Sequence, residues 1–499
     1  MIDDNPFGAD PVNAPLLIIG AGPVGLTMAC ELARYGAPLR IIDKADQRTD
    51  KSKAVVVWSR TLELLDRAGL AATFVSAAIK WSGANILAGG ERLAHVDFDE
   101  IESPFPFALG LPQSETERLL EERLAALGIL VERKTELTEF EQREDGVSSV
   151  LRKVDGASET LESSWLIGCD GAHSRVRHGL GLAFRGATLA TEFGLADVRL
   201  AGLDAPADEL AMHMHQEGAI GFFPIRGDRW RIIAEIGNLH GEARQDLSFE
   251  EMQALVARRV PGVTLSDPVW VSPFAINERM VEDYRVSRVF VAGDAAHVHS
   301  PAGGQGMNTG MQDAFNLAWK LALVGKGLGD PDALLDSYSP ERSAVARQVL
   351  KDSGRLTEIA TLKNPVAEHL RNFVARHLLG LEIARHAVAQ RLSETSVGYP
   401  ESPLNEGSAH GLKGPAPGAR CIAATPFGAG HLPRFALAAA PSERASKILG
   451  DYWRIMESGL RTPPDPKGAW LVRPDGYVAA VARADDLSPI ESALTPVAG

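Results

Sequence analysis

The chain has 499 residues, 45% apolar and 23% charged, which excludes a disordered protein and leaves room for several packed domains. Its formal net charge of −14, without any basic tract, argues against nucleic acid or an anionic membrane as a partner, because phosphate binding needs clustered Lys and Arg. Cys30, Cys169 and Cys421 lie far apart without metal-ligand spacing, so we expect reduced thiols and no metal.

The N-terminal residues give no sign of export. They read MIDDNPFGADPVN and lack the basic start and apolar core of a signal peptide. No apolar run reaches the roughly 18 residues that a membrane span needs. We therefore expect a soluble, cytoplasmic protein.

The first predicted unit is a strand, a glycine-rich turn, a helix and a second strand. Residues 15–19 (PLLII) form an apolar strand, apolar positions recur at helical spacing over residues 23–35, and residues 39–42 form the second strand. In the turn, Gly20, Gly22 and Gly25 have the GxGxxG spacing that lets the backbone approach a pyrophosphate. Asp43 ends the second strand, at the spacing of an acceptor for ribose hydroxyls. Alone, this pattern predicts a dinucleotide site only.

The middle of the chain alternates between helices and strands. Residues 60–70 and 113–127 predict two amphipathic helices that end at glycines, and residues 161–168 predict a strand that leads into CDGAHSRVR. Strand-like alternation over residues 191–236 predicts an antiparallel sheet that covers the substrate.

A second glycine-rich turn, GDAAHVHSPAGGQGMN, follows a strand predicted over residues 288–292. Asp294 can accept hydrogen bonds from a sugar-alcohol chain, while Gly303, Gly304 and Gly306 let the backbone lie close to a flat ring. The helix predicted over residues 311–323 directs its positive end at that ring, where it would stabilise a reduced flavin. Further helix is predicted over residues 364–391.

With these three motifs, the chain resembles the FAD-dependent aromatic hydroxylases, the single-component flavoprotein monooxygenases that include phenol and polyketide hydroxylases. The resemblance extends over nearly the whole chain. It implies an α/β fold in which a Rossmann-type FAD-binding domain carries an inserted antiparallel-sheet substrate domain and a C-terminal thioredoxin-like domain. We expect the FAD-binding domain in residues 1–185 and 276–394, with residues 80–110 contributing to the substrate pocket, the substrate domain in 186–275 and the thioredoxin-like domain in 395–499.

The resemblance also implies how FAD is held. Asp170 and Gly171 would help close the site, Asp294 would bind the ribityl chain, and Gln113 and Arg60 would contact the flavin nucleotide. Where many members carry an Arg after the second strand, this chain has Lys51 and Lys53, which keep the charge without the bidentate fork. The predicted cofactor-binding residues are Gly20, Gly22, Gly25, Asp43, Lys53, Arg60, Gln113, Asp170, Gly171, Asp294, Pro301, Gly304, Gly306, Met307 and Asn308.

The substrate pocket should be apolar, because a hydroxylase must hold an electron-rich ring beside the flavin and exclude water. The segment MHMHQEGAIGFFPI supplies the candidate lining residues Met212, Met214, Phe222, Phe223 and Pro224. His213 and His215 are candidate polar groups, although strand alternation places both opposite Met212 and Met214. His297, in the flavin loop, is a candidate for catalysis or for orienting the loop. The sequence assigns no acid or base.

These features predict an NAD(P)H- and O2-dependent FAD monooxygenase that hydroxylates a phenolic or polycyclic aromatic compound, such as a polyketide, through a flavin hydroperoxide. No second nucleotide-binding fingerprint is present, so we expect NAD(P)H to bind transiently as the reductant. A flavin-dependent halogenase is one alternative, although the WxWxIP signature is absent, and a non-catalytic flavin-binding scaffold is another. A homodimer stays open. In the C-terminal region, the single Cys421 excludes dithiol exchange.

Overall fold

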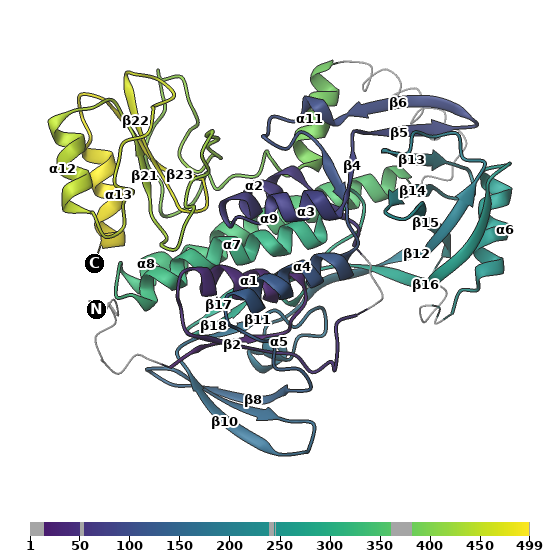
Figure 1. Cartoon of the computed structure of the whole chain (residues 1–499), viewed down its shortest axis with the longest axis horizontal. Helices are drawn as coiled ribbons and strands as arrows, with labels where there is room; N and C mark the ends of the chain where they lie inside the picture. Colours follow the sequence, from purple (N-terminus) through teal and green to yellow (C-terminus); the bar gives the residue numbers. More distant parts are fainter. Residues whose placement is uncertain (1–13, 50–53, 239–243, 245, 361–381, 499) are drawn as a thin grey trace.

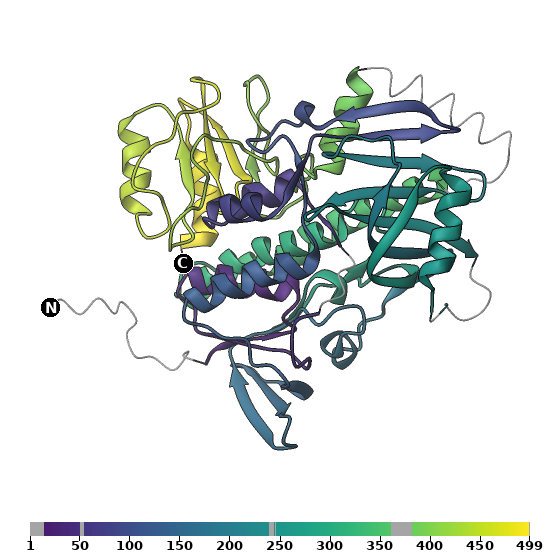
Figure 2. The same ribbon diagram turned by 45° about the vertical axis from the view of Figure 1, so that its right-hand side comes forward.

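The computed structural model describes residues 14–49, 54–238, 244, 246–360 and 382–498. Lys51, Lys53 and most of the helix predicted over residues 364–391 lie outside these residues. The large sheet stands at one end of the molecule and the C-terminal region at the other, with a long central helix between them (Figures 1 and 2). No helix in the described part of the chain combines the length and apolar composition needed to cross a bilayer.

A five-stranded sheet carries the first glycine-rich turn. Its order is β17 (Arg285–Val286), β18 (Val289–Val291), β11 (Leu166–Gly168), β1 (Leu16–Ile19) and β2 (Leu39–Ile42). The last four strands run parallel, and β17 closes the edge antiparallel. All residues of β1, β11 and β18 are buried, as expected for the continuous apolar runs of parallel strands. The predicted strand–turn–helix–strand unit is therefore present.

Helices pack along this sheet, and the central one links both glycine-rich turns. α7 (Gly306–Gly325) packs on α1 (Pro23–Arg34), which also contacts α4 (Gln113–Ala126). The structure begins α7 five residues before the predicted start at residue 311, because the glycines of the loop continue into its first turn. After α7 come α8 (Pro331–Asp336) and α9 (Tyr338–Ala360).

The strand predicted over residues 161–168 is two strands in different sheets. β10 (Ser158–Ser163) pairs with β9 (Val147–Arg152), which pairs with β8 (Glu136–Gln142), whereas β11 pairs with β1. The chain changes partners at Ser164, whose backbone N–H donates to the carbonyl of Pro15. α5 (Arg175–Gly179) then follows the CDGAHSRVR motif.

An eight-stranded sheet forms the second large layer. In sheet order its strands are β19 (His297–Val298), β16 (Thr264–Met280), β12 (Arg185–Ala201), β15 (Arg229–Asn238), β14 (Ile220–Ile225), β13 (Glu209–Met214), β5 (Gly83–Ala88) and β6 (Glu91–Asp97). Its pairings are antiparallel except that of β13 with β5. α6 (Phe249–Arg259) covers one face (Figure 1). β16 extends across the domain boundary expected after residue 275. One part of this strand therefore lies in the predicted substrate domain and the other in the predicted FAD-binding domain.

Shorter elements connect the two large sheets. A small sheet is formed by β3 (Val56–Val57), β7 (Ala108–Gly110) and β4 (Ile79–Trp81), and its strand β3 contacts α7. α2 (Ser59–Arg67) packs against α3 (Ala71–Ala77) and α7. Two single turns of 3-10 helix occur, η1 (Phe98–Glu100) and η2 (Gly293–Ala295). α11 (Glu382–Leu392) packs on η1 and β6.

The C-terminal region has its own sheet, and part of its core is shared with α7 and α8. The order is β20 (Glu406–Gly407), β23 (Val478–Arg483), β22 (Gly468–Val472) and β21 (Ala436–Ala438), accompanied by α12 (Glu443–Asp451) and α13 (Ser488–Ala498). β22 and β23 form an antiparallel pair around the turn at residues 474–476. The division of the chain into four domains at the stated boundaries stays a prediction.

Candidate active site

The first glycine-rich turn is shaped by close backbone contacts at two glycines and left open at the third. Gly20 has a positive φ of 98°, and a Cβ there would lie 2.5 Å from the carbonyl oxygen of Cys169. A Cβ on Gly25 would lie 1.9 Å from the carbonyl oxygen of Gly20. Gly22, the N-cap of α1, has nothing within 4 Å of its Cβ position and no side-chain cap. The helix N-terminus is therefore open to an anionic ligand.

Asp43 lies beside this turn. Its Oδ2 accepts a hydrogen bond of 2.7 Å from the backbone N–H of Ala21, and its Oδ1 accepts one of 2.8 Å from Ala45. The Arg133 guanidinium lies 3.9 Å from the same carboxylate. β2 thus delivers Asp43 to the carboxyl edge of the sheet, where the turn begins.

The CDGAHSRVR motif lies against the same turn because β11 is the neighbour of β1. The backbone N–H of Cys169 donates to Ile19, and Asp170 lies directly beyond Gly20. Asp170 Oδ2 accepts from the backbone N–H groups of Arg175 and Val176 at 2.6 and 3.2 Å, and burial raises the pKa of this carboxyl. Gly171 follows in the bend, with open space at its Cβ position.

The second glycine-rich turn converges on the first through Val24. A Cβ on Gly293 would lie 2.6 Å from the Val24 side chain, and one on Gly310 would lie 2.8 Å from it. Only glycine at both positions allows the turn of η2 and the start of α7 to pack on α1. Asp294, on η2, is exposed at this junction.

The loop before α7 is held by Trp58 and Asn308. The Trp58 indole N–H donates to the carbonyl of Gly303 at 2.9 Å, and its backbone N–H donates to Asn308 Oδ1 at 2.9 Å. Asn308 Nδ2 donates to the carbonyls of Val56 and Gly304. The side chain of Asn308 therefore organises the loop. Pro301, Gly306 and Met307 complete the segment predicted to border the flavin.

Asp313, on α7, contacts three other parts of this region. Its fully buried carboxylate accepts from the backbone N–H of Gly293 at 2.9 Å and from Arg342 Nε at 2.6 Å, and it lies 2.9 Å from His297 Nε2. Burial would raise the pKa of Asp313, but the charges of Arg342 and His297 hold it below the usual value. Asp313 thus links His297 to Gly293 and Arg342. Arg342 lies on α9, and no local sequence motif indicates its role.

His299 lies next to His297, with the two rings stacked at 6.2 Å. Its Nδ1 lies 2.9 Å from the carbonyl of Ser300, and its buried Nε2 has no hydrogen-bond partner among the described residues. Burial lowers the pKa of His299 to about 4, so the ring is neutral at pH 7.

The structure directs Arg60 away from these motifs. The buried Arg60 guanidinium donates to Glu63 and to the carbonyl of Asp475, both at 2.8 Å, and lies over the ring of Tyr477. It therefore joins α2 to the C-terminal hairpin. Gln113 begins α4, where its side chain donates to Glu117 at 2.9 Å.

The predicted substrate residues divide between the two faces of the large sheet. Phe222 lies in the core beneath α6, with His213 edge-on to its ring at 5.5 Å, and burial lowers the pKa of His213. Met212 and Phe223 share the other face, since both would contact a Cβ placed on Gly221.

The other candidates are at strand ends or in contacts with the small sheet. Met214 ends β13 opposite Ala88. His215 follows β13 and accepts the backbone N–H of Glu217. The carbonyl of Pro224 accepts from the indole of Trp81 at 3.0 Å. His213 and His215 therefore do not form a pair at one site.

A buried ion pair that the sequence did not reveal lies on the face of Met212 and Phe223. Arg231, opposite Phe223 in the sheet, donates to both oxygens of Asp197 at 2.6 and 2.7 Å. The indole of Trp270 donates to Asp197 at 3.0 Å, and Arg231 also donates to the carbonyl of Ala54. The last contact connects this sheet face to Ala54, the residue that follows Lys53 in the sequence.

Two helix N-termini without side-chain caps lie at glycine-rich turns beside a broad sheet, an arrangement typical of an enzyme that binds a dinucleotide. The comparisons agree. Residues 13–353 match the family described as FAD binding domain. The chain is 36% identical over 509 residues to 6-methylpretetramide 4-monooxygenase of Streptomyces rimosus, covering 93% of this chain and 90% of that protein.

Two further similarities bear on the class. The chain is 36% identical to pentachlorophenol 4-monooxygenase of Sphingobium chlorophenolicum, over 70% of this chain and 66% of that one. The solved structure of the anhydrotetracycline hydroxylase OxyS from Streptomyces rimosus matches with a TM-score of 0.80 at 30% identity, covering 97% of this chain and 99% of that one. The chain belongs to the FAD-binding family of aromatic monooxygenases. It is an enzyme with FAD as its cofactor. The relatives are monooxygenases, and they favour monooxygenase activity over that of a halogenase and over a non-catalytic scaffold.

Proposed function

We propose that the protein is an NAD(P)H-dependent hydroxylase of polycyclic phenolic compounds of the polyketide type. The observation that carries the proposal is the extent of the similarity. The match to the pretetramide monooxygenase extends over 93% of the chain, whereas the match to the pentachlorophenol enzyme extends over 70%. The C-terminal region that the FAD-binding match leaves out is therefore shared with the enzyme named for the larger, polycyclic substrate.

The residues at the first turn fit the ADP half of FAD. The open space at Gly22 and the uncapped N-terminus of α1 suit the pyrophosphate, and Asp43 is beside them for the ribose. Gly20 and Gly25 would shape this turn, and Asp170 and Gly171 would close it from β11. Gln113 would approach from the start of α4.

The residues at the second turn fit the flavin end. Asp294 would accept hydrogen bonds from the ribityl chain, and Pro301, Gly304, Gly306 and Met307 would border the ring. The N-terminus of α7, which has no side-chain cap, would favour negative charge on the reduced ring. Bound FAD supplies the reductive activation of O2. NAD(P)H binds transiently and reduces the FAD.

The inner face of the large sheet would hold the substrate ring. Met212 and Phe223 offer apolar contacts on β13 and β14, and Phe193 and Phe274 are 5.7 Å apart on the neighbouring strands β12 and β16. The Arg231–Asp197 pair satisfies its own charges within the sheet, so it adds little cost to an apolar pocket. These residues would exclude water while oxygen is transferred.

For the C-terminal region we propose a thioredoxin-like packing module over residues 395–499, with the domain boundaries predicted above. Its mixed four-stranded sheet with two helices supports this assignment. Burial raises the pKa of its one cysteine, Cys421, to about 11, which supports a role in packing rather than redox exchange.

A substrate panel tests the proposal. The purified holoenzyme is incubated with NADH or NADPH and with phenols of one, two, three and four fused rings, and both NAD(P)H oxidation and products are followed by absorbance and mass spectrometry. We expect stimulated oxidation and a product 16 mass units heavier with the three- and four-ring compounds. Stimulation by monocyclic phenols alone would overturn the assigned substrate class.

A further inference from the structure

Glu394 occupies a position that is unfavourable for a glutamate in two respects. It follows α11 with a φ of +59°, the left-handed region that favours glycine. Its side chain is also buried, with 1% exposure. A charged side chain in such a place needs strong compensating contacts.

Those contacts are all on the first turns of α7. Thr309 Oγ1 donates to Glu394 Oε1 at 2.6 Å, and Gln312 Nε2 donates to Oε2 at 2.6 Å. Thr309 directly follows Asn308, the residue that holds the loop assigned to the flavin ring. The carboxyl group of Glu394 is therefore hydrogen-bonded to α7, the helix whose N-terminus would face the flavin.

The hydrogen bonds extend from α7 into the second glycine-rich turn. The backbone carbonyl of Thr309 accepts from Arg342 at 3.0 Å, and Arg342 donates to Asp313, which holds Gly293 and His297. In addition, Gln305, just before α7, donates to the carbonyl of Arg391 on α11. Glu394 thus closes a continuous chain of contacts around the start of α7.

The charged groups around Glu394 come from several elements. Burial raises the pKa of Glu394 to about 7, against the lowering effects of Thr309, Arg342 on α9 and Gln312, whereas Asp313 on α7 raises it. Arg391, on α11, is 65% exposed and turned toward Asp352. Arg60, on α2, is paired with Glu63. The carboxyl group therefore exchanges its proton within the ordinary working range of pH.

We propose that Glu394 is a positioning residue of the flavin site, whose carboxylate fixes the first turns of α7 against the flavin loop and whose protonation loosens that attachment. The inference rests on the FAD assignment made above. The ionised carboxylate accepts from both donors through charge-assisted hydrogen bonds, which are the stronger kind. Protonation neutralises the group and obliges one oxygen to donate, so the Thr309 hydroxyl has to reorient.

The test compares Glu394→Gln, which keeps the shape and cannot ionise, with Glu394→Gly, which suits the left-handed backbone and removes the side chain. Glu382→Gln, an exposed residue at the start of α11, is the matched control. Absorbance and fluorescence of bound FAD are recorded from pH 5.5 to 9 without substrate, and FAD affinity is measured by reconstituting the apoprotein.

We expect one spectral transition near pH 7 in the wild type and in Glu382→Gln, and none in Glu394→Gln, whose spectrum should match the low-pH wild type at every pH. Glu394→Gly should bind FAD about tenfold more weakly at pH 8, the loss expected for one charge-assisted hydrogen bond. A wild-type transition that persists in Glu394→Gln, or a wild-type FAD affinity in Glu394→Gly, would overturn the proposal. These readouts need no substrate, so failure of the proposed hydroxylation would be recognised separately.

Discussion

Gly22 and Gly25 differ in what an added methyl group would meet. At Gly25 it would strike the backbone of Gly20, so that glycine is required by the fold itself. At Gly22 it would meet no protein atom within 4 Å, and the backbone there does not need a positive φ. A side chain at Gly22 therefore obstructs only a ligand.

We predict that Gly22→Ala folds normally and binds FAD at least tenfold more weakly, because the methyl group occupies the approach of the pyrophosphate. Gly450→Ala is the control, since Gly450 is also in an open, exposed position, on α12. Urea denaturation checks the fold, and FAD titration of the apoprotein checks the affinity. Equal FAD affinity in the two variants would contradict the assignment of the turn.

Glu394 predicts a pH-dependent stability at the same scale. The fold raises its pKa from 4.5 to about 7, so between these values the native protein keeps a proton that the unfolded chain has released. Burial penalises the carboxylate by more than its hydrogen bonds to Thr309 and Gln312 stabilise it, so the contribution of Glu394 to stability falls as pH rises through this window, by about 3 kcal/mol in all. Relative to Glu394→Gln, the wild type should lose that amount between pH 4.5 and pH 8 in urea denaturation. A constant difference would refute the buried titration.

The sequence located residues whose role depends on local spacing and missed those that act through distant partners. Gly20, Gly22, Gly25 and Asp43 could be found because the turn and both strands are contiguous. No sequence pattern indicates the contact of Arg60 with the carbonyl of Asp475, because the two residues are 415 positions apart. The contact of Arg60 with the flavin nucleotide stays a prediction. Glu394 gave no signal, because neither its left-handed backbone nor its contacts with α7 follow from its neighbours in sequence.

At the scale of elements, an indole contact helps to hold the loop before α7. Trp58 is buried, and its Nε1 donates to the carbonyl of Gly303. This hydrogen bond fixes the position of the loop relative to β3. Trp58→Phe removes this donor and keeps an apolar ring, so the loss should be about 1 kcal/mol in loop stability.

We expect Trp58→Phe to oxidise NAD(P)H at a near-normal rate while forming less hydroxylated product, because a looser loop admits water to the flavin site. The ratio of product formed to NAD(P)H consumed is the measurement. Trp453→Phe, at a tryptophan that is 66% exposed, is the control and should keep the wild-type ratio. An unchanged ratio in Trp58→Phe would show that the indole contact does not hold the loop.

Element boundaries were predictable where a physical stop signal is present. The second strand and the start of α4 agree with the prediction, and α1 ends one residue earlier. The strand over residues 161–168 was mispredicted because no turn residue divides it. Its first residues, in β10, are partly exposed and those in β11 are buried, and the change of pairing partner at Ser164 separates the two strands. α7 begins earlier than predicted because glycines, which usually disfavour helix, form its first turn.

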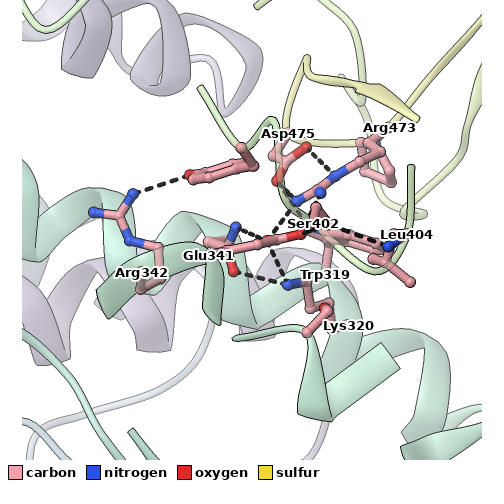
Figure 3. Close-up of polar contacts among 12 residues, drawn as sticks. Trp319, Lys320, Glu341, Arg342, Ser402, Leu404, Arg473 and Asp475 are labelled. Carbon is pink, nitrogen blue, oxygen red and sulfur yellow. Dashed lines mark hydrogen bonds and ion pairs between the residues drawn. The ribbon is translucent and has the colours of Figure 1, made fainter. Parts of the chain in front are cut away.

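For the whole molecule, a buried cluster of charges joins the C-terminal region to the central helices (Figure 3). Arg473 donates to Glu341 at 2.6 Å and to Asp475 at 2.6 Å, and Lys320 on α7 donates to Glu341 at 2.8 Å. These side chains are at most 2% exposed. Burial lowers the pKa of Lys320 to about 8, so the cluster depends on mutual pairing to keep its charges.

We predict that Arg473→Met destabilises the protein by about 3–5 kcal/mol, because it leaves Asp475 and part of Glu341 buried without their cation. Arg444→Met, at a half-exposed pair with Glu491, should cost less than about 1 kcal/mol. Urea denaturation monitored by tryptophan fluorescence compares the two, and Trp319, which donates to Asp475, should report the change. Equal costs would mean that the cluster does not hold the C-terminal region.

The α/β class and the flavin chemistry were predictable because three short motifs carry them. The assembly of the parts was not, since Arg473 and Glu341 are 132 residues apart and no periodic pattern pairs them. The same holds for the large sheet, whose last two strands in sheet order, β5 and β6, come from early in the chain.

The central claim is that this enzyme inserts one atom of O2 into a polycyclic phenol at the expense of NAD(P)H. The direct measurement is incubation of the holoenzyme, NAD(P)H and a three- or four-ring phenol under isotopically labelled O2, followed by mass spectrometry of the product. We predict one labelled oxygen per product molecule and one NAD(P)H oxidised for each. Oxidation that yields only hydrogen peroxide, or a product whose new oxygen comes from water, would contradict the account.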